Sequence, residues 1–191
     1  MSRYPFARID LAALKHNLQQ VRQYAPDSKV MSVIKADAYG HGFIKIAKAL
    51  NQSDAFAVAR LSEALALRQN GFQQPITIFE GVSSTEEWHL VSDYGLTAVL
   101  HQQQHLDSLI NAGINRPLPA IWLMLETGMH RLGLPEPAIQ QIIHQLEKRK
   151  DLVEQYGLMS HFANSDLLDD LRNQQQLAIM HKLAESTGLP V

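Results

Sequence analysis

Residues 29–34 read KVMSVI, a short and mostly apolar run that is followed directly by Lys35. A run of this length and composition is typical of a strand that is buried on both faces of a parallel sheet. Five further runs of the same kind follow along the chain, at residues 55–59, 76–79, 96–100, 120–125 and 157–160. We therefore predict six parallel strands.

Segments with helical periodicity separate these runs. They lie at roughly residues 41–51, 62–70, 84–93, 102–111, 136–149 and 167–187, and one more, at about 10–24, precedes the first strand. Asp10 is a suitable N-cap residue for the first of these helices, and Ser83 and Ser84 both offer an N-cap for the helix at 84–93. Four glycines follow predicted helix ends, as C-cap glycines do: Gly71, Gly95, Gly113 and Gly188.

Strands that alternate with helices through short links predict repeated βα units and a parallel sheet. A dinucleotide-binding fold needs a Gly-x-Gly-x-x-Gly turn after its first strand, and the pair Gly40 and Gly42 lacks that spacing. We therefore predict an α/β fold of the (β/α)8 TIM-barrel type. A complete barrel has eight units and typically about 250 residues. Residues 1–191 are expected to form one incomplete barrel domain with about six of the eight units.

Composition excludes several classes of protein. The chain is 46% hydrophobic and 19% charged, with a formal net charge of −2, and no long basic run suggests nucleic acid as a partner. It contains no cysteine, so neither disulfides nor thiolate chemistry are expected. No stretch has the length of a membrane span or the pattern of a signal peptide. We expect a soluble, cytoplasmic protein that binds no membrane.

Polar residues that follow predicted strands are the candidates for chemistry, because the carboxyl ends of barrel strands carry the active site. They are Lys35, Arg60, Glu80, Arg131 and His161. A lysine directly after a buried strand is partly desolvated, which favours the neutral, nucleophilic amine. Such lysines form Schiff bases with carbonyl compounds, including pyridoxal 5'-phosphate (PLP). The alternative is a lysine whose stem lies along the strand end and whose ammonium reaches water.

Three segments resemble those of the alanine racemase family, and they occur in the family's order. They are residues 33–42 (VIKADAYGHG), 125–133 (LETGMHRLG) and 160–166 (SHFANSD). The first departs from the commoner form at Asp37, where the family usually has Asn. The resemblance extends over essentially all 191 residues, and it implies PLP as the cofactor.

The resemblance implies a role for four residues. Lys35 carries PLP as a Schiff base and is one of two catalytic bases, while Tyr39 binds the cofactor phosphate. Arg131 binds the phenolic oxygen of the cofactor and helps to bind the substrate. His161 belongs to a hydrogen-bond chain beside the cofactor ring and is counted with Lys35 as catalytic. In many relatives a carbamylated lysine orients the arginine, but Met124 stands at that position and carries no charge.

Local sequence alone leaves other interpretations open for these residues. Tyr39 could pack in a core or an interface, Arg131 could lie on the surface, and His161 could be a buried histidine at a strand end. His101 and His105 have the spacing of a helical metal pair, but no third ligand follows. We therefore predict a solvated polar helix face there and no metal site.

By resemblance, the activity is the interconversion of L-alanine and D-alanine, with D-alanine supplied for peptidoglycan, in a homodimer. The family's second base is a tyrosine in a C-terminal β domain, contributed by the other subunit, and that domain is expected to lie outside residues 1–191. A polypeptide of these residues alone is therefore expected to be weakly active or inactive. Two alternatives are a single-barrel PLP-binding protein of cofactor homeostasis and a non-enzymatic assembly intermediate.

Overall fold

The computed structural model describes residues 6–191. The chain divides into two compact units, and the boundary in the sequence lies between Ile76 and Thr77. Both units alternate parallel strands with helices, as the sequence predicts. Within residues 6–191, no helix combines the length and the apolar character that a membrane span requires.

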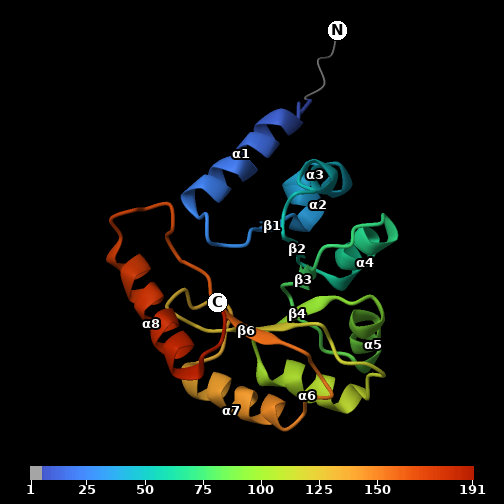
Figure 1. Ribbon diagram of the computed structural model, residues 1–191, viewed down its shortest axis with the longest axis vertical. Helices are drawn as coiled ribbons and strands as arrows, with labels where there is room; N and C mark the ends of the chain where they lie inside the picture. The colour runs from blue at the N-terminus through green and yellow to red at the C-terminus, as the bar shows by residue number, and fades with distance from the viewer. Residues whose placement is uncertain (1–5) are drawn as a thin grey trace. The chain divides into compact units, whose positions relative to one another are not determined.

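The first unit contains two parallel strands and four helical segments (Figure 1). In chain order they are α1 (Leu11–Tyr24), β1 (Met31–Val33), α2 (Lys35–Gly40), α3 (Phe43–Ala49), β2 (Ala55–Val58) and α4 (Leu61–Gln69). Met31 is opposite Ala55 in the register of β1 and β2. The predicted cap of α1 is confirmed, because the Asp10 carboxylate accepts hydrogen bonds from the first turn of the helix.

The second unit contains four strands in the order of the chain, all parallel, and Figure 1 shows its helices outside them. Its elements are β3 (Ile76–Ile78), which starts at the boundary, α5 (Thr85–Asp93), β4 (Thr97–Leu100), α6 (Gln103–Ala112), β5 (Ile121–Met124), α7 (Glu136–Glu147), β6 (Tyr156–Met159) and α8 (Leu171–Thr187). Val99 is opposite Trp122 between β4 and β5, and Leu123 is opposite Leu158 between β5 and β6. The six predicted βα units are therefore present.

Burial on both faces explains why β3 and β4 read as continuous apolar runs. All four residues of β4 are buried, and so are all three of β3. The helices of the second unit complete its core with side chains such as Trp88, Leu106 and Leu109, none of which has solvent-exposed area. The apolar pattern of these two strands thus reports burial on both faces, with helices covering the outer face of the sheet. For β1 the expectation of a buried strand is wrong, because its first two residues are only partly buried and Val33 is exposed.

Most predicted helix bounds lie within two residues of the observed ones, but α8 begins at Leu171 and not at residue 167. Gly113 and Gly188 cap α6 and α8 with φ of 61° and 68°, the left-handed conformation that glycine adopts without steric penalty. Ser84 caps α5 by accepting a hydrogen bond from the Glu87 amide. Beyond α8 the chain lies beside β6, where the Leu158 amide donates to the Pro190 carbonyl.

Candidate active site

The segment after β1 is a left-handed turn, which the sequence did not predict. Four consecutive non-glycine residues, from Ala36 to Tyr39, have φ between 51° and 56°. Each such residue costs roughly 1–2 kcal/mol relative to the right-handed conformation. The turn therefore needs contacts that hold it in place.

The Glu63 carboxylate supplies the first set of these contacts. One oxygen accepts a hydrogen bond from the Ala36 amide at 2.7 Å, and the other accepts from the amides of Ala59 and Arg60 at 2.9 and 3.1 Å. Glu63 lies in the first turn of α4, just after β2. It thus joins the chain next to Lys35 to the carboxyl end of the neighbouring strand.

Contacts within the turn complete its support. The Asp37 carboxylate accepts a hydrogen bond from the Phe43 amide at 2.8 Å, which ties the turn to the start of α3. The Gly42 amide donates to the Asp37 carbonyl, and the His41 ring lies 2.8 Å from the Ala38 carbonyl through Nδ1. Asp37 thus contributes both its backbone and its side chain to the turn.

Lys35 and Tyr39 lie at the two ends of this turn. Lys35 is half-buried, and its ammonium makes no hydrogen bond or ion pair with any residue of the described range 6–191. The Tyr39 side chain is 61% exposed and lines a cavity of about 420 Å³ together with residues of α1. The turn therefore presents an amine and a phenol that are both accessible.

The loop after β5, which carries Arg131, is closed at its base. The Glu126 amide donates to the Leu134 carbonyl at 3.0 Å, and the Leu134 amide donates to the Met124 carbonyl at 2.8 Å. Gly133 packs against this base so tightly that a Cβ would lie 2.8 Å from the Glu126 nitrogen. Residues 126–133 thus form a loop whose two ends are held together.

Glu126 organises the inside of this loop. Burial opposes its ionisation, but hydrogen bonds from the backbone amides of Gly128, His130 and Met129 hold the pKa of the Glu126 carboxyl below its usual value. The Arg131 guanidinium is exposed and has no hydrogen bond or ion pair within residues 6–191. Hydrogen bonds to Glu126 therefore fix the backbone before Arg131, while the Arg131 side chain is available to a ligand.

The loop after β6 begins at Ser160 and carries His161. The exposed His161 side chain lines a cavity of about 130 Å³ together with Thr127 of the β5 loop. The hydroxyls of Thr127 and Ser160 are 2.7 Å apart. The loops that carry Arg131 and His161 are therefore neighbours, whereas Lys35 and Tyr39 belong to the other unit.

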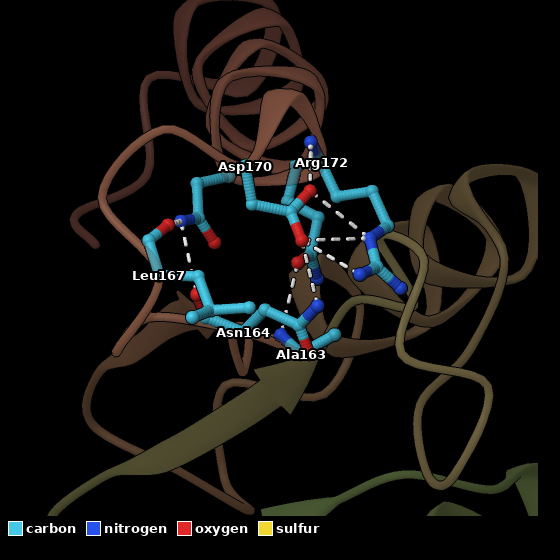
Figure 2. Close-up of polar contacts among 7 residues, drawn as sticks. Ala163, Asn164, Leu167, Asp170 and Arg172 are labelled. Carbon is cyan, nitrogen blue, oxygen red and sulfur yellow. Dashed lines mark hydrogen bonds and ion pairs between the residues drawn. The ribbon is translucent and has the colours of Figure 1, made fainter.

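Figure 2 shows how the far end of the β6 loop is held. The Asn164 amide donates to the Asp170 carboxylate at 2.7 Å, and the Arg172 guanidinium donates to both oxygens of that carboxylate. The guanidinium and the amide hold the pKa of the Asp170 carboxyl far below its usual range. Asp170 also caps α8, so one carboxylate secures the loop and starts the helix.

The prediction of a solvated face is wrong for His105, whereas His101 is partly exposed. His105 is 1% exposed, and its ring packs edge-on against that of His101 with centroids 4.5 Å apart. Burial and the nearby His101 lower the pKa of His105 to about 4. No cluster of three metal-ligating side chains occurs within residues 6–191. Helix periodicity alone did not reveal that this face of α6 packs against the chain after β3.

Two residues that shape these loops were missed in the sequence. Glu63 occupies the third position of α4, where the sequence pattern of a capping box places a glutamate. Gln176 stands in a run of three glutamines, yet it shares the buried face of α8 with Met180 and Leu183. Its i, i+4, i+7 spacing with these two residues was the signal that a buried amide lay there.

Comparison with known proteins shows the family to which the chain belongs. Residues 9–190 match the family described as alanine racemase, N-terminal domain. The alanine racemase of Nitrosococcus oceani is 44% identical over 181 residues, which cover 95% of this chain and 51% of that protein. The biosynthetic alanine racemase of Escherichia coli is 40% identical over 178 residues, which cover 93% of this chain and 49% of that protein.

Solved structures give the same result. The alanine racemase of Acinetobacter baumannii has a TM-score of 0.82 and 38% sequence identity over 93% of this chain and 52% of that chain. This likeness confirms the predicted barrel-type α/β fold. The chain spans about half the length of the curated relatives it matches.

Proposed function

We propose that this chain, which belongs to the alanine racemase family by its N-terminal domain, supplies the lysine-bearing part of a PLP-dependent racemase active site. One observation carries the proposal. A half-buried lysine without a partner among the described residues follows a strand, on a strained turn that Glu63 and Asp37 hold in place. Strain that surrounding contacts maintain is typical of a functional site.

The side chains on the loops fit PLP by their chemistry. Lys35 offers an amine for the cofactor aldehyde, and Tyr39 offers an exposed hydroxyl donor for a phosphate. Arg131 offers a fork of donors that no described residue occupies and that suits an oxyanion or a carboxylate. When bound, PLP withdraws electrons from the α carbon of an amino acid and so acidifies its α proton.

Each residue then has a role in the proposed reaction. The Lys35 amine takes the α proton from one face of the substrate, the D-alanine face, and returns it there. Tyr39 would hold the phosphate of bound PLP, and Arg131 would donate to its phenolic oxygen and to the substrate carboxylate. His161 would belong to the hydrogen bonds that limit protonation of the cofactor's ring nitrogen. Racemisation also requires a group that protonates the opposite face.

We place that second group, a tyrosine of the partner subunit in a homodimer, outside residues 1–191. A polypeptide of these residues alone is then expected to show little or no turnover of alanine, because one lysine mostly returns the proton to the face it left. Robust turnover by the purified chain would contradict this expectation. In the whole protein, the proposed role is the supply of D-alanine for peptidoglycan in the cytoplasm. The relatives' names favour this role over a non-catalytic PLP-binding protein.

The test is the reaction of the purified chain with PLP, followed by borohydride reduction and peptide mass spectrometry. We expect a visible absorption band before reduction and a pyridoxyl adduct on the peptide that contains Lys35. Lys35→Ala should remove both, whereas Lys48→Ala, which alters an exposed lysine of α3, should keep both. An adduct spread evenly over the exposed lysines, or none, would refute the proposed role of Lys35.

A further inference from the structure

Gln176 is a buried amide whose polar atoms are all hydrogen-bonded to the two loops of the second unit. Its side chain is 3% exposed. The amide nitrogen donates to the Thr127 hydroxyl at 3.0 Å and to the His161 carbonyl at 2.9 Å. The amide oxygen accepts from the Ala163 backbone amide at 3.0 Å. These three partners determine the orientation of the amide.

The hydrogen bond from Gln176 to Thr127 continues as a chain through two hydroxyl groups to a backbone carbonyl, and each group donates to the next. Ser160 uses its only hydroxyl proton to donate to the Leu125 carbonyl at 3.0 Å. The Thr127 hydroxyl must therefore donate to Ser160, and its own oxygen accepts from Gln176. Every donor in the chain thus has an acceptor, and the chain begins at Gln176.

Gln176 also lies near Gly128 of the β5 loop. Its Cγ would be 3.6 Å from a Cβ added at Gly128, so a larger residue there would contact Gln176. Gly128 is three residues before Arg131, and His161 is the residue whose carbonyl accepts from Gln176. One side chain of α8 therefore touches both loops close to their candidate functional residues.

We propose that Gln176 is a positioning residue that sets the Arg131-bearing loop against the His161-bearing loop. The proposal rests on the proposed function, in which both residues face a cofactor. A buried amide is suited to this task, because losing one partner leaves the other polar groups unsatisfied. The two loops are thus held in one arrangement.

The first test is hydrogen–deuterium exchange of the full chain with Gln176→Met, a substitution of similar length without polar atoms. We expect exchange at residues 126–134 and 160–164 to rise by about 10-fold or more, as loss of these bonds implies, with no change in β2 or β4. Gln175→Met, the same change at the exposed neighbouring position, should leave both loops as they are. Unchanged protection of both loops in Gln176→Met would overturn the proposal.

A second variant decides the question even if Gln176→Met unfolds. Thr127→Val keeps the shape of Thr127 and replaces its hydroxyl with a methyl group. Exchange should therefore rise at residues 126–134, while residues 160–164 stay protected through the hydrogen bonds from Gln176 to His161 and from Ala163 to Gln176. An equal rise of exchange in both loops, or no rise in either loop, would overturn the proposal.

A spectroscopic measurement tests whether the hydrogen bonds of Gln176 affect the environment of the cofactor. In chain that has reacted with PLP, Gln176→Met should shift the visible absorption maximum, and Gln175→Met should not. An unshifted maximum in a variant with loosened loops would overturn the positioning role. If the unaltered chain takes up no PLP, the proposed function fails, and the exchange data still decide whether Gln176 joins the two loops.

Discussion

Asp37 illustrates how a single departure from the family pattern is accommodated. The family usually has Asn at this position, and both side chains present a carboxyl or amide oxygen at the same distance from the backbone. The Asp37 oxygen accepts a hydrogen bond from the Phe43 amide, which an Asn oxygen could accept equally well. Both residues also tolerate a positive φ better than most others do. The departure therefore leaves the turn intact.

This account predicts the effect of substitutions at Asp37. Asp37→Asn should change the free energy of unfolding by less than about 0.5 kcal/mol, whereas Asp37→Ala should lower it by about 1 kcal/mol because the Phe43 amide loses its acceptor. Urea unfolding followed by circular dichroism measures both. Asp27→Ala, at an exposed site, is the control and should have little effect. Equal stability of the Ala and Asn variants would contradict the role of the carboxylate.

At the scale of elements, hydrogen bonds hold the ends of the three loops that carry the candidate site residues. The turn after β1 is joined to the end of β2 by Glu63, and the loop after β5 is closed by backbone bonds at Glu126 and Leu134. The loop after β6 is held by Gln176 and by the capping carboxylate of α8. The exposed side chains of Tyr39, Arg131 and His161 are therefore attached to backbone that hydrogen bonds hold in place.

The base of the β5 loop gives a prediction about Gly133. Gly133→Ala should lower the free energy of unfolding by about 1–3 kcal/mol, because the new Cβ would meet the Glu126 backbone at a φ of 125°. Gly71→Ala is the matched control. It has a φ of 86° and no atom within 4 Å of the new Cβ, so only the cost of the backbone conformation, about 1 kcal/mol, applies. Chemical denaturation compares them, and equal losses would argue against a clash at the loop base.

At the scale of the whole molecule, stability should depend on the protonation of His105. Its pKa is lowered to about 4 in the folded chain, from an ordinary value of 6.5. The Gln102 amide nitrogen, which can only donate, lies 2.8 Å from His105 Nε2, so that bond requires the neutral ring. Between pH 6.5 and 4 the unfolded chain therefore binds one more proton than the folded chain at this site, and stability falls as the pH falls.

The expected size of the effect is roughly 1 kcal/mol of unfolding free energy for each pH unit in that window. His105→Gln should reduce this slope, even if it also lowers stability at pH 7. His144→Gln, at a side chain that is 66% exposed, should leave the slope unchanged. Urea titrations at a series of pH values measure the slopes, and identical slopes for the His105 variant and the unaltered chain would refute the assignment.

Much of the fold could be predicted because its signals are local. Each strand is a short apolar run, and glycines such as Gly113 and Gly188 follow the helices they cap. Lys35, Tyr39, Arg131 and His161 were also identified from the sequence, since the segments that carry them resemble those of a family. The roles assigned to these four residues stay predictions.

What only the tertiary structure decided are the contacts between segments far apart in sequence. Gln176 is 49 residues from Thr127, and Glu63 is 27 residues from Ala36. His105 is buried because the chain at Gly81 packs against its ring. The sequence by itself determined the order of the elements and the residues at the strand ends, because hydrophobic period and capping act over a few residues. The left-handed turn after β1 and the closed arrangement of the β5 and β6 loops depend on hydrogen bonds that form only when distant elements pack.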